Sequence, residues 1–300
     1  MEVLAKIMEI LKEHSNHVVG GASINVPLFK QIAVKIEEGQ ELVFLLPAFP
    51  AKSPSPLKTS GVLPDLGEVL ALQNIQNLCE RISALYEPGA KVIICSDGRV
   101  FSDVVHVSDE SITKYQKGIH DIIKEFNLNR LETFALDDLY PGKNGDELRD
   151  HLLEQFAISI EEVRSLVCTD ETYQKLFNGL HKFLVEDELA IRPELSKNKV
   201  SKETKLRTYE LMRRSDAWSE LLRHYFKNHL RLSIHPYQLE HEKFGIKLVS
   251  SSNKWATPWH NVTVKIKNKF ELMHKQDALK LKAIPKMMKD KYAYFEIAEI

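Results

Sequence analysis

The fold of this 300-residue chain is decided by a short apolar stretch, Leu42-Val43-Phe44-Leu45-Leu46, which a proline ends. An unbroken apolar run of this length is typical of a strand that is buried on both faces of a parallel sheet. Similar runs follow at residues 91–95 and 132–136, and the segments between the runs, 65–86 and 108–126, have the apolar spacing of helices. This alternation predicts an α/β fold with a mostly parallel sheet and flanking helices.

The rest of the chain changes in pattern and in charge. Residues 131–190 contain 14 Asp and Glu but 5 Lys and Arg, and the segment 141–195 has the pattern of helices. We expect a mobile polar loop at 196–202, a long basic helix at 202–225, and strands at 230–234, 247–249, 260–266 and 292–297. We therefore expect an N-terminal half with ligand loops (1–140), an acidic helical insertion (141–200) and a C-terminal α+β portion (201–300) that completes the site.

Overall charge and cysteine content argue against several classes of protein. The chain has 41 Lys and Arg against 42 Asp and Glu, whereas a general nucleic-acid binder needs an excess of basic residues. Cys79, Cys95 and Cys168 form no CxxC pair, and the histidines lack zinc-ligand spacing, so we expect a reduced protein without a metal. No apolar run is long enough for a membrane span, and the first 14 residues have helical rather than signal-peptide spacing. We expect a cytoplasmic protein that binds no membrane.

The loop at residues 47–61 leaves the carboxyl end of the first predicted strand, which is where open α/β sheets bind ligands. It contains two lysines, four hydroxyl side chains and four prolines. Lysine binds phosphate as a point charge, and hydroxyls donate to phosphate oxygens, so Lys52, Ser53 and Lys58 are candidate ligands of a phosphate group. The alternative is a stiff, solvated surface loop without a ligand.

Charged residues also follow the second predicted strand, at Ser96-Asp97-Gly98-Arg99 and Asp103. Two carboxylates can act as acid and base when their surroundings separate their pKa values, so Asp97 and Asp103 are candidates for proton transfer. The alternative is a simple turn, because Asp-Gly is a common turn dipeptide. The pair Asp137-Asp138 is better explained as a helix cap than as a cation site.

Two segments near the C-terminus carry further candidates. Alternation along 229–236 places Arg231, Ser233 and His235 on one face of a strand, where the arginine could clamp an anion and the histidine could transfer protons. The segment 254–260 contains Trp255, Trp259 and His260, which could form the wall of a pocket. A solvent-facing strand and ordinary core packing are the alternatives, as a solvated helix face is for Arg214.

Five of these segments together resemble the PvcA-type isocyanide synthase family, also called the pyoverdine/dityrosine biosynthesis family. The resembling pieces occur in order between about residues 44 and 262. They are Leu46-Pro47-Ala48-Phe49-Pro50-Ala51-Lys52-Ser53, Ser96-Asp97-Gly98-Arg99-Val100-Phe101-Ser102-Asp103, Arg214-Ser215-Asp216-Ala217-Trp218-Ser219, Arg231-Leu232-Ser233-Ile234-His235-Pro236 and Thr257-Pro258-Trp259-His260.

The resemblance implies a Rossmann-like core and an enzyme that converts the amino group of an aromatic L-amino acid into an isonitrile. It implies ribulose 5-phosphate as the carbon donor, no metal or nucleotide cofactor, and a 2-oxoglutarate/iron oxygenase as a pathway partner. The residues would then divide into two sets. We assign proton transfer to Asp97, Asp103, His235 and His260, and substrate binding to Lys52, Ser53, Lys58, Arg99, Arg214, Arg231, Ser233, Trp255 and Trp259.

Three other functions remain open at this point. A fungal branch of the same family is expected to make N-formyl tyrosine instead of an isonitrile. A nucleotide- or S-adenosylmethionine-dependent enzyme could have a similar sheet, although no Gly-x-Gly-x-x-Gly motif follows the first strand. A non-catalytic small-molecule sensor could also have kept the fold.

Overall fold

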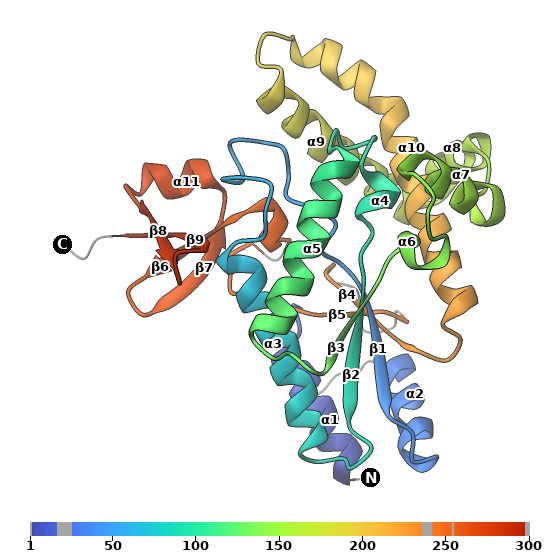
Figure 1. Cartoon of the computed structure of the whole chain (residues 1–300). Coiled ribbons are helices and arrows are strands. Elements are labelled where there is room, and N and C mark those ends of the chain that lie inside the picture. Colours follow the sequence, from blue (N-terminus) through green and yellow to red (C-terminus); the bar gives the residue numbers. More distant parts are fainter. Residues whose placement is uncertain (1, 17–25, 236–241, 254, 298–300) are drawn as a thin grey trace.

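The computed structural model describes residues 2–16, 26–235, 242–253 and 255–297. Its centre is a five-stranded sheet in which every strand pair is parallel (Figure 1). The strands are β1 (Leu42–Pro47), β2 (Ala90–Cys95), β3 (Leu131–Phe134), β4 (Leu230–Ser233) and β5 (Phe244–Gly245). Their order is β3-β2-β1-β4-β5. The chain adds β2 and β3 on one side of β1 and then β4 and β5 on the other, so the order in which strands are added reverses between β1 and β4. Ligands of open α/β sheets bind at the carboxyl ends of the strands beside such a reversal.

Helices cover both faces of this sheet, as the unbroken apolar strands predict. One buried cluster joins Phe44, Leu46 and Ile94 to apolar residues of four helices. These helices are α1 (Glu2–Glu13), α2 (Val26–Glu37), α3 (Leu66–Ser83) and α5 (Asp109–Glu125). The alternate strand residues Leu45 and Ile93 pack instead against four other helices. Those are α4 (Gly98–Phe101), α6 (Leu136–Leu139), α7 (Gly145–Phe156) and α10 (Lys197–Tyr225).

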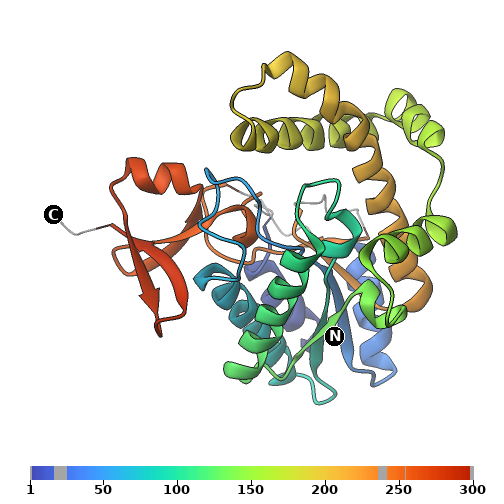
Figure 2. The ribbon, with the colours of Figure 1, turned by 45° about the horizontal axis from the view of Figure 1, so that its top comes forward.

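A helical insertion separates β3 from β4. After α6 and α7, the chain forms α8 (Ile160–Thr169), α9 (Glu171–Ile191) and the 29-residue α10. The last two helices pack against each other along much of their length, and a smaller cluster around Val163, Phe177 and Met212 joins them to α8. Figure 2 shows α8, α9 and α10 arching over the carboxyl edge of the central sheet. The insertion therefore covers the edge where a ligand is expected.

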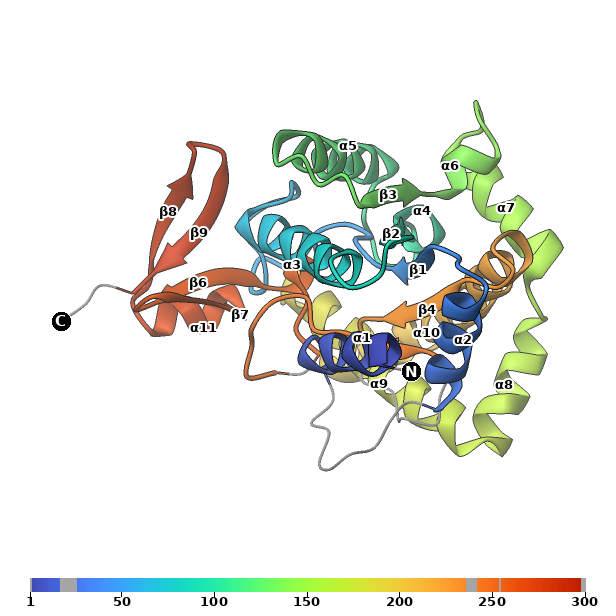
Figure 3. The same cartoon turned by 90° about the horizontal axis from the view of Figure 1, so that it is seen from below.

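The C-terminal part forms a second, four-stranded sheet beside α3 (Figure 3). Its order is β7-β6-β9-β8, with β6 (Val262–Ile266), β7 (Lys269–Met273), β8 (Ile284–Met288) and β9 (Tyr292–Glu296). A single 3-10 turn, η1 (Pro258–His260), precedes it, and α11 (Lys275–Lys280) lies between β7 and β8. Tyr292 connects the two parts of the molecule, because it is buried and its ring lies 5.9 Å from that of Phe126.

Most predicted elements are confirmed, and α3 begins as its sequence indicates. Asp65 accepts the backbone N–H of Gly67 at 2.8 Å, and Glu68 accepts that of Asp65 at 2.9 Å, so the two carboxylates cap the helix. Asp138 likewise accepts the backbone N–H of Ala135 at 2.8 Å, which confirms the expected cap.

Three local predictions are wrong. Residues 196–202 form no loop, because Ser196 caps α10 by accepting the backbone N–H of Lys199. Residues 247–249 form no strand, and β5 lies just before them. His260 belongs to η1 and not to the following strand. Pro236, the last residue of the segment 229–236 in which alternation is expected, lies outside the described residues. No helix in the described part of the chain is long and apolar enough to cross a bilayer.

Candidate active site

A cavity of about 250 Å³ opens at the carboxyl edge of the central sheet, where the order of the strands reverses. Loops after β1, β2 and β4 meet there with η1 and with the helices α9 and α10. Six of the residues predicted from the sequence line the cavity: Lys52, Ser53, Asp97, His235, Trp259 and His260. The parallel sheet thus gathers at one place side chains that are far apart in the sequence.

Asp97 is the carboxylate with the most unusual surroundings in this cavity. It follows β2, and its Oδ1 is buried without a hydrogen-bond partner among the described residues. Burial raises the pKa of Asp97 to about 7, although a backbone hydrogen bond acts in the opposite direction. Its neighbour Gly98 must be a glycine, since a Cβ there would collide with the backbone oxygen of Pro50. This close approach of two loops holds Asp97 in the cavity as a group that can donate or accept a proton near neutral pH.

Two neutral histidines face the same cavity. Burial and the charge of Lys243 lower the pKa of His235 to about 4, and burial with the charge of Lys58 lowers that of His260 to about 3. Part of His235 is exposed to solvent, and this exposure makes the lowering of its pKa smaller than complete burial would. Nδ1 of His260 lies 3.2 Å from Oγ1 of Thr257, which orients the ring. Both imidazoles are therefore uncharged near pH 7 and available as bases.

Lys52 has a structural role in this fold. Its Nζ lies 2.8 Å from both Asp65 and Glu68 and donates to the backbone oxygen of Pro258 at 3.0 Å. Burial alone would lower the pKa of this ammonium, but the two carboxylates raise it above its ordinary value. An ammonium has three protons, and these three acceptors account for all of them. Lys52 therefore has no N–H left for a phosphate, contrary to the expectation from its sequence position.

Lys58 and Ser53 connect the same loop to helix α9. Nζ of Lys58 lies 2.5 Å from Oδ1 of Asp187, and Oγ of Ser53 donates to Oδ2 of that residue at 3.2 Å. Burial raises the pKa of Asp187, although Lys58 counteracts this effect. Lys58 also lies over the ring of Phe183, 4.6 Å from its centre. Because the described residues give Lys58 one carboxylate partner and Lys52 two, Lys58 is the better candidate for an anionic ligand.

The aromatic wall of the cavity differs from the predicted one. Trp259 is buried, and its ring lies 5.2 Å from that of Phe49. Trp255 is 60% exposed and does not line the cavity, although its ring lies 5.3 Å from that of His235. Phe183 of α9 stands instead 5.0 Å from the ring of His260.

Three predicted site residues form ion pairs beside the cavity. Both oxygens of Asp103 accept from Arg214, at 2.5 and 3.0 Å, and this pairing lowers the pKa of the carboxylate despite its partial burial. The Arg99 guanidinium donates to Asp137 at 3.2 Å and to the backbone oxygen of Asp109 at 2.7 Å. None of these three lines the cavity. The carboxylate pair expected from Asp97 and Asp103 is therefore not assembled.

The polar face of β4 is divided between two places. His235 reaches the cavity, but Arg231 lines a separate cavity of about 480 Å³ with Lys35 of α2 and His229. Ser233 is buried and accepts the backbone N–H of His235 at 3.1 Å. Strand β4 ends at Ser233, so the alternation expected as far as His235 stops there. Arg231 and His235 therefore lie in different cavities.

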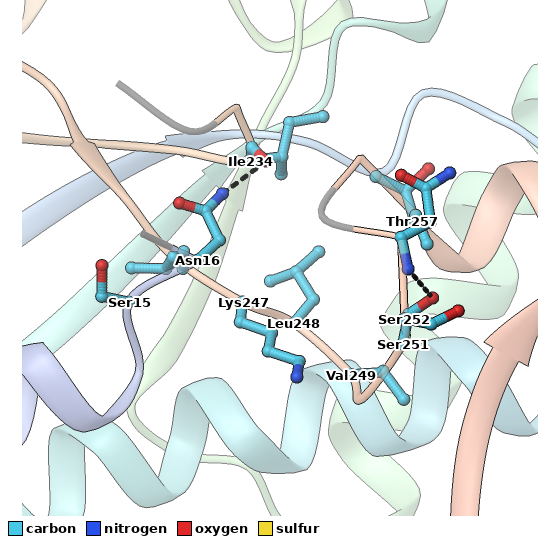
Figure 4. A pocket seen from close by; sticks show the side chains of 12 residues that line it. Ser15, Asn16, Ile234, Lys247, Leu248, Val249, Ser251, Ser252 and Thr257 are labelled. Atoms are coloured by element: carbon cyan, nitrogen blue, oxygen red, sulfur yellow. Dashed lines mark hydrogen bonds between the residues drawn. The ribbon is translucent and has the colours of Figure 1, made fainter. Parts of the chain in front are cut away.

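A third cavity, of about 250 Å³, lies between the end of α1 and the segment 246–257 (Figure 4). Nδ2 of Asn16 donates to the backbone oxygen of Ile234 at 2.9 Å and so fixes the end of β4. This cavity contains neither Asp97 nor the two histidines, so we place the chemistry in the first cavity.

Sequence reasoning missed Asp187, Phe183 and Ser215, which all belong to the cavity. Ser215 stands inside one of the matched motifs and could have been found there. Phe183 and Asp187 are four residues apart on one helix, but they lie in a segment that matched no motif. In the described part of the chain, no three His, Cys, Asp or Glu side chains are placed to hold a metal ion.

The fold and this cavity define an α/β protein with a cavity at the carboxyl edge of a parallel sheet, where acid–base groups lie beside an apolar wall. The chain belongs to the pyoverdine/dityrosine biosynthesis protein family, whose model matches residues 32–284. It is 42% identical over 247 residues to an L-tryptophan isonitrile synthase of Fischerella ambigua, covering 82% of this chain and 75% of the relative.

Another relative and a solved structure agree with this assignment. The chain is 39% identical over 254 residues to an L-tyrosine isonitrile synthase of Xenorhabdus nematophila, covering 83% of this chain and 76% of the relative. The crystal structure of the PvcA protein from Pseudomonas aeruginosa matches with a TM-score of 0.90 and 33% identity, over 98% of this chain and 99% of that one. The expected family and the α/β fold are therefore confirmed.

Proposed function

We propose that this protein is an isonitrile synthase that acts on an aromatic L-amino acid and takes the isonitrile carbon from C2 of ribulose 5-phosphate. The observation that carries the proposal is the carboxyl group of Asp97. Its Oδ1 is buried with no hydrogen-bond partner in the described part of the chain, and burial raises its pKa to about 7. It shares one cavity with two neutral histidines and an apolar wall. The names of the relatives support the same reaction and the same class of amino acid.

The first step, imine formation, needs a proton acceptor and a proton donor, and this cavity supplies both. The amine nitrogen adds to the C2 ketone and loses two protons, and the ketone oxygen takes up two protons and leaves as water, which gives an imine. His235 and His260 are uncharged near pH 7 and can take protons from nitrogen, as weaker bases than an imidazole in water because their pKa values are lowered. Asp97, partly protonated at that pH, is suited to donate one to the leaving oxygen.

The later steps are proton shifts, loss of phosphate and cleavage of the bonds from C2 to C1 and C3, since an isonitrile carbon is bonded to nitrogen alone. Loss of phosphate requires that a C–H bond give up its proton, since the phosphate leaves with the electron pair of its C–O bond. Ionised Asp97 or a neutral histidine can accept that proton. We assign the sugar phosphate to Lys58, because Nζ of this residue has one carboxylate partner, whereas Lys52 has two.

The test is a reaction of the purified protein with ribulose 5-phosphate labelled with ¹³C at C2 and, in turn, L-tryptophan, L-tyrosine and L-phenylalanine. We expect mass spectrometry to find an isonitrile that carries the label, with EDTA present and no nucleotide added. An N-formyl product would be heavier by one water and would identify the reaction expected of the fungal branch. Failure of every amino acid to react would contradict the proposal. A 2-oxoglutarate/iron oxygenase that consumes the isonitrile completes the proposed pathway.

A further inference from the structure

One face of helix α9 lines the cavity with apolar side chains. Leu176, Leu180 and Phe183 occupy positions i, i+4 and i+7 of this helix, which places them on a single face. Leu176 is 43% exposed, and Leu180 and Phe183 are half-buried. The packing of α9 against α10 therefore leaves these three side chains partly uncovered. Phe177 and Leu184 are buried on the adjacent face, which packs against α10, and Leu180 and Phe183 lie at the border between that face and the cavity.

The cavity is therefore divided into an apolar part and a polar part. Residues from the segment after β2 and from the neighbouring helices α5 and α10 extend the apolar part. They are Phe101, Val105, Val107, Ile112 and Leu211. Phe183 stands at the boundary, because its ring lies 5.0 Å from that of His260 and 4.6 Å from Nζ of Lys58. A ligand with one polar and one apolar end has a single orientation that suits both parts.

Helix α9 is also held in place at the cavity. Asp187, one turn after Phe183, accepts from Lys58 and Ser53 of the loop that follows β1. A wall that is fixed by a buried ion pair keeps a defined distance from the proton-transfer groups. Such a wall can select between ligands by their size.

We propose that the face formed by Leu176, Leu180 and Phe183 binds the side chain of the amino-acid substrate, and that Leu180 limits the size of that side chain. This proposal rests on the proposed function, because it assumes that the ligand is an aromatic amino acid. The α-amino group then lies toward Asp97 and the histidines, and the ring lies against α9.

The experiment compares L-tryptophan with L-phenylalanine, which differ in ring size but share the reacting groups. Leu180→Phe fills part of the apolar space and should lower the tryptophan-to-phenylalanine ratio of kcat/KM by about tenfold or more. Leu180→Ala opens the space and should raise that ratio. The apparent KM for ribulose 5-phosphate should stay unchanged in both variants.

Leu206 offers a matched control, because it is a leucine of the neighbouring helix α10 that is 57% exposed and does not line the cavity. Leu206→Phe and Leu206→Ala should leave the ratio as in the wild type. A change in the Leu180 variants that is equal for both amino acids would overturn the side-chain site. Circular dichroism melts identify any variant that fails to fold, in which case Leu176→Phe repeats the test at the neighbouring turn.

Equilibrium binding separates this proposal from the proposed function. Calorimetric titration measures the affinity of the wild type and the Leu180 variants for each amino acid without any turnover. If the binding preference changes in the Leu180 variants but no isonitrile forms, the reaction is wrong and the side-chain site stands. If isonitrile forms and neither preference changes, the site on α9 is wrong.

Discussion

Nζ of Lys58 and Oδ1 of Asp187 lie 2.5 Å apart, although 129 positions separate the two residues in the sequence. This ion pair joins the loop after β1 to the arch formed by the helical insertion. Burial raises the pKa of Asp187, and the ammonium of Lys58 counteracts this effect. Because the ammonium has three N–H groups, Lys58 can donate to a phosphate while one N–H stays on Asp187.

Replacement of Lys58 by alanine should weaken the binding of the sugar phosphate. Loss of a charged hydrogen bond costs about 1.5–3 kcal/mol, so the apparent KM for ribulose 5-phosphate should rise by roughly 10- to 150-fold. Steady-state kinetics at saturating amino acid measures this change. Lys182→Ala, on the exposed side of α9, serves as the control. An unchanged KM in Lys58→Ala would place the phosphate elsewhere.

Replacement of Asp97 by asparagine should remove most of the turnover, since an amide cannot transfer the proton. We expect a loss of about 10²–10⁴-fold in kcat. In the wild type, the pH profile of kcat/KM should show an ionisation near pH 7, because the pKa of Asp97 is raised to about 7. That ionisation should be absent from the residual activity of the variant. Its persistence would assign it to another group.

The same substitution should stabilise the fold above neutral pH. The pKa of Asp97 is about 7 in the folded protein and about 3.9 in an unfolded chain, so the folded state holds the extra proton between these values. Wild-type stability therefore falls as pH rises from about 4 to 7, by up to ~4 kcal/mol. The Asp97→Asn variant has no carboxyl group to ionise, so its stability does not fall in this way. Its Tm should exceed that of the wild type at pH 8, and the difference should shrink toward pH 5.

Replacement of Lys52 by methionine should destabilise the protein rather than change substrate binding. Asp65 and Glu68 would lose the ammonium between them, and Glu68 is completely buried. Removal of one partner of a buried ion pair costs about 3–5 kcal/mol. Urea unfolding measures the loss, and activity per folded molecule should show a normal KM for ribulose 5-phosphate. A raised KM with normal stability would restore the role in phosphate binding that the sequence suggests.

Replacement of His235 by alanine should lower turnover by about 10²–10⁴-fold with a small effect on substrate affinity. The reason is its place in the cavity as a neutral imidazole. A thermal melt with the activity assay separates this outcome from simple loss of stability. Near-normal turnover in the folded fraction would mean that His260 or Asp97 performs the proton transfer alone.

The central sheet could be predicted from the sequence because its strands are buried on both faces and so leave an unbroken apolar signal. The predicted starts of three strands lie within one residue of the observed starts, at Leu42, Lys91 and Leu230. The second sheet was harder to predict. Strand β8 is mostly exposed and β7 has one buried residue, so neither shows an apolar run.

Of the site residues, those at or near the end of a predicted strand could be located from the sequence. Asp97 and His235 follow strands of one parallel sheet, and carboxyl ends of parallel strands meet at one edge, which brings both residues to one cavity. The partners of the charged groups could not be derived, because pairing depends on contacts between distant segments. Lys52 and Lys58 look alike in the sequence, yet one is enclosed by Asp65 and Glu68 and the other meets Asp187 from the helical insertion.

The position of β4 between β1 and β5 has a consequence for how the protein is made. A ribosome releases β1, β2 and β3 early, but the strand that pairs with the free side of β1 comes after the whole helical insertion. Until then β1 is an open, strongly apolar edge, which invites pairing with other nascent chains. The demand for chaperones should therefore last until β4 has been synthesised. A chain that stops before residue 230 would keep most of its helices but would lack β4 and the last wall of its cavity.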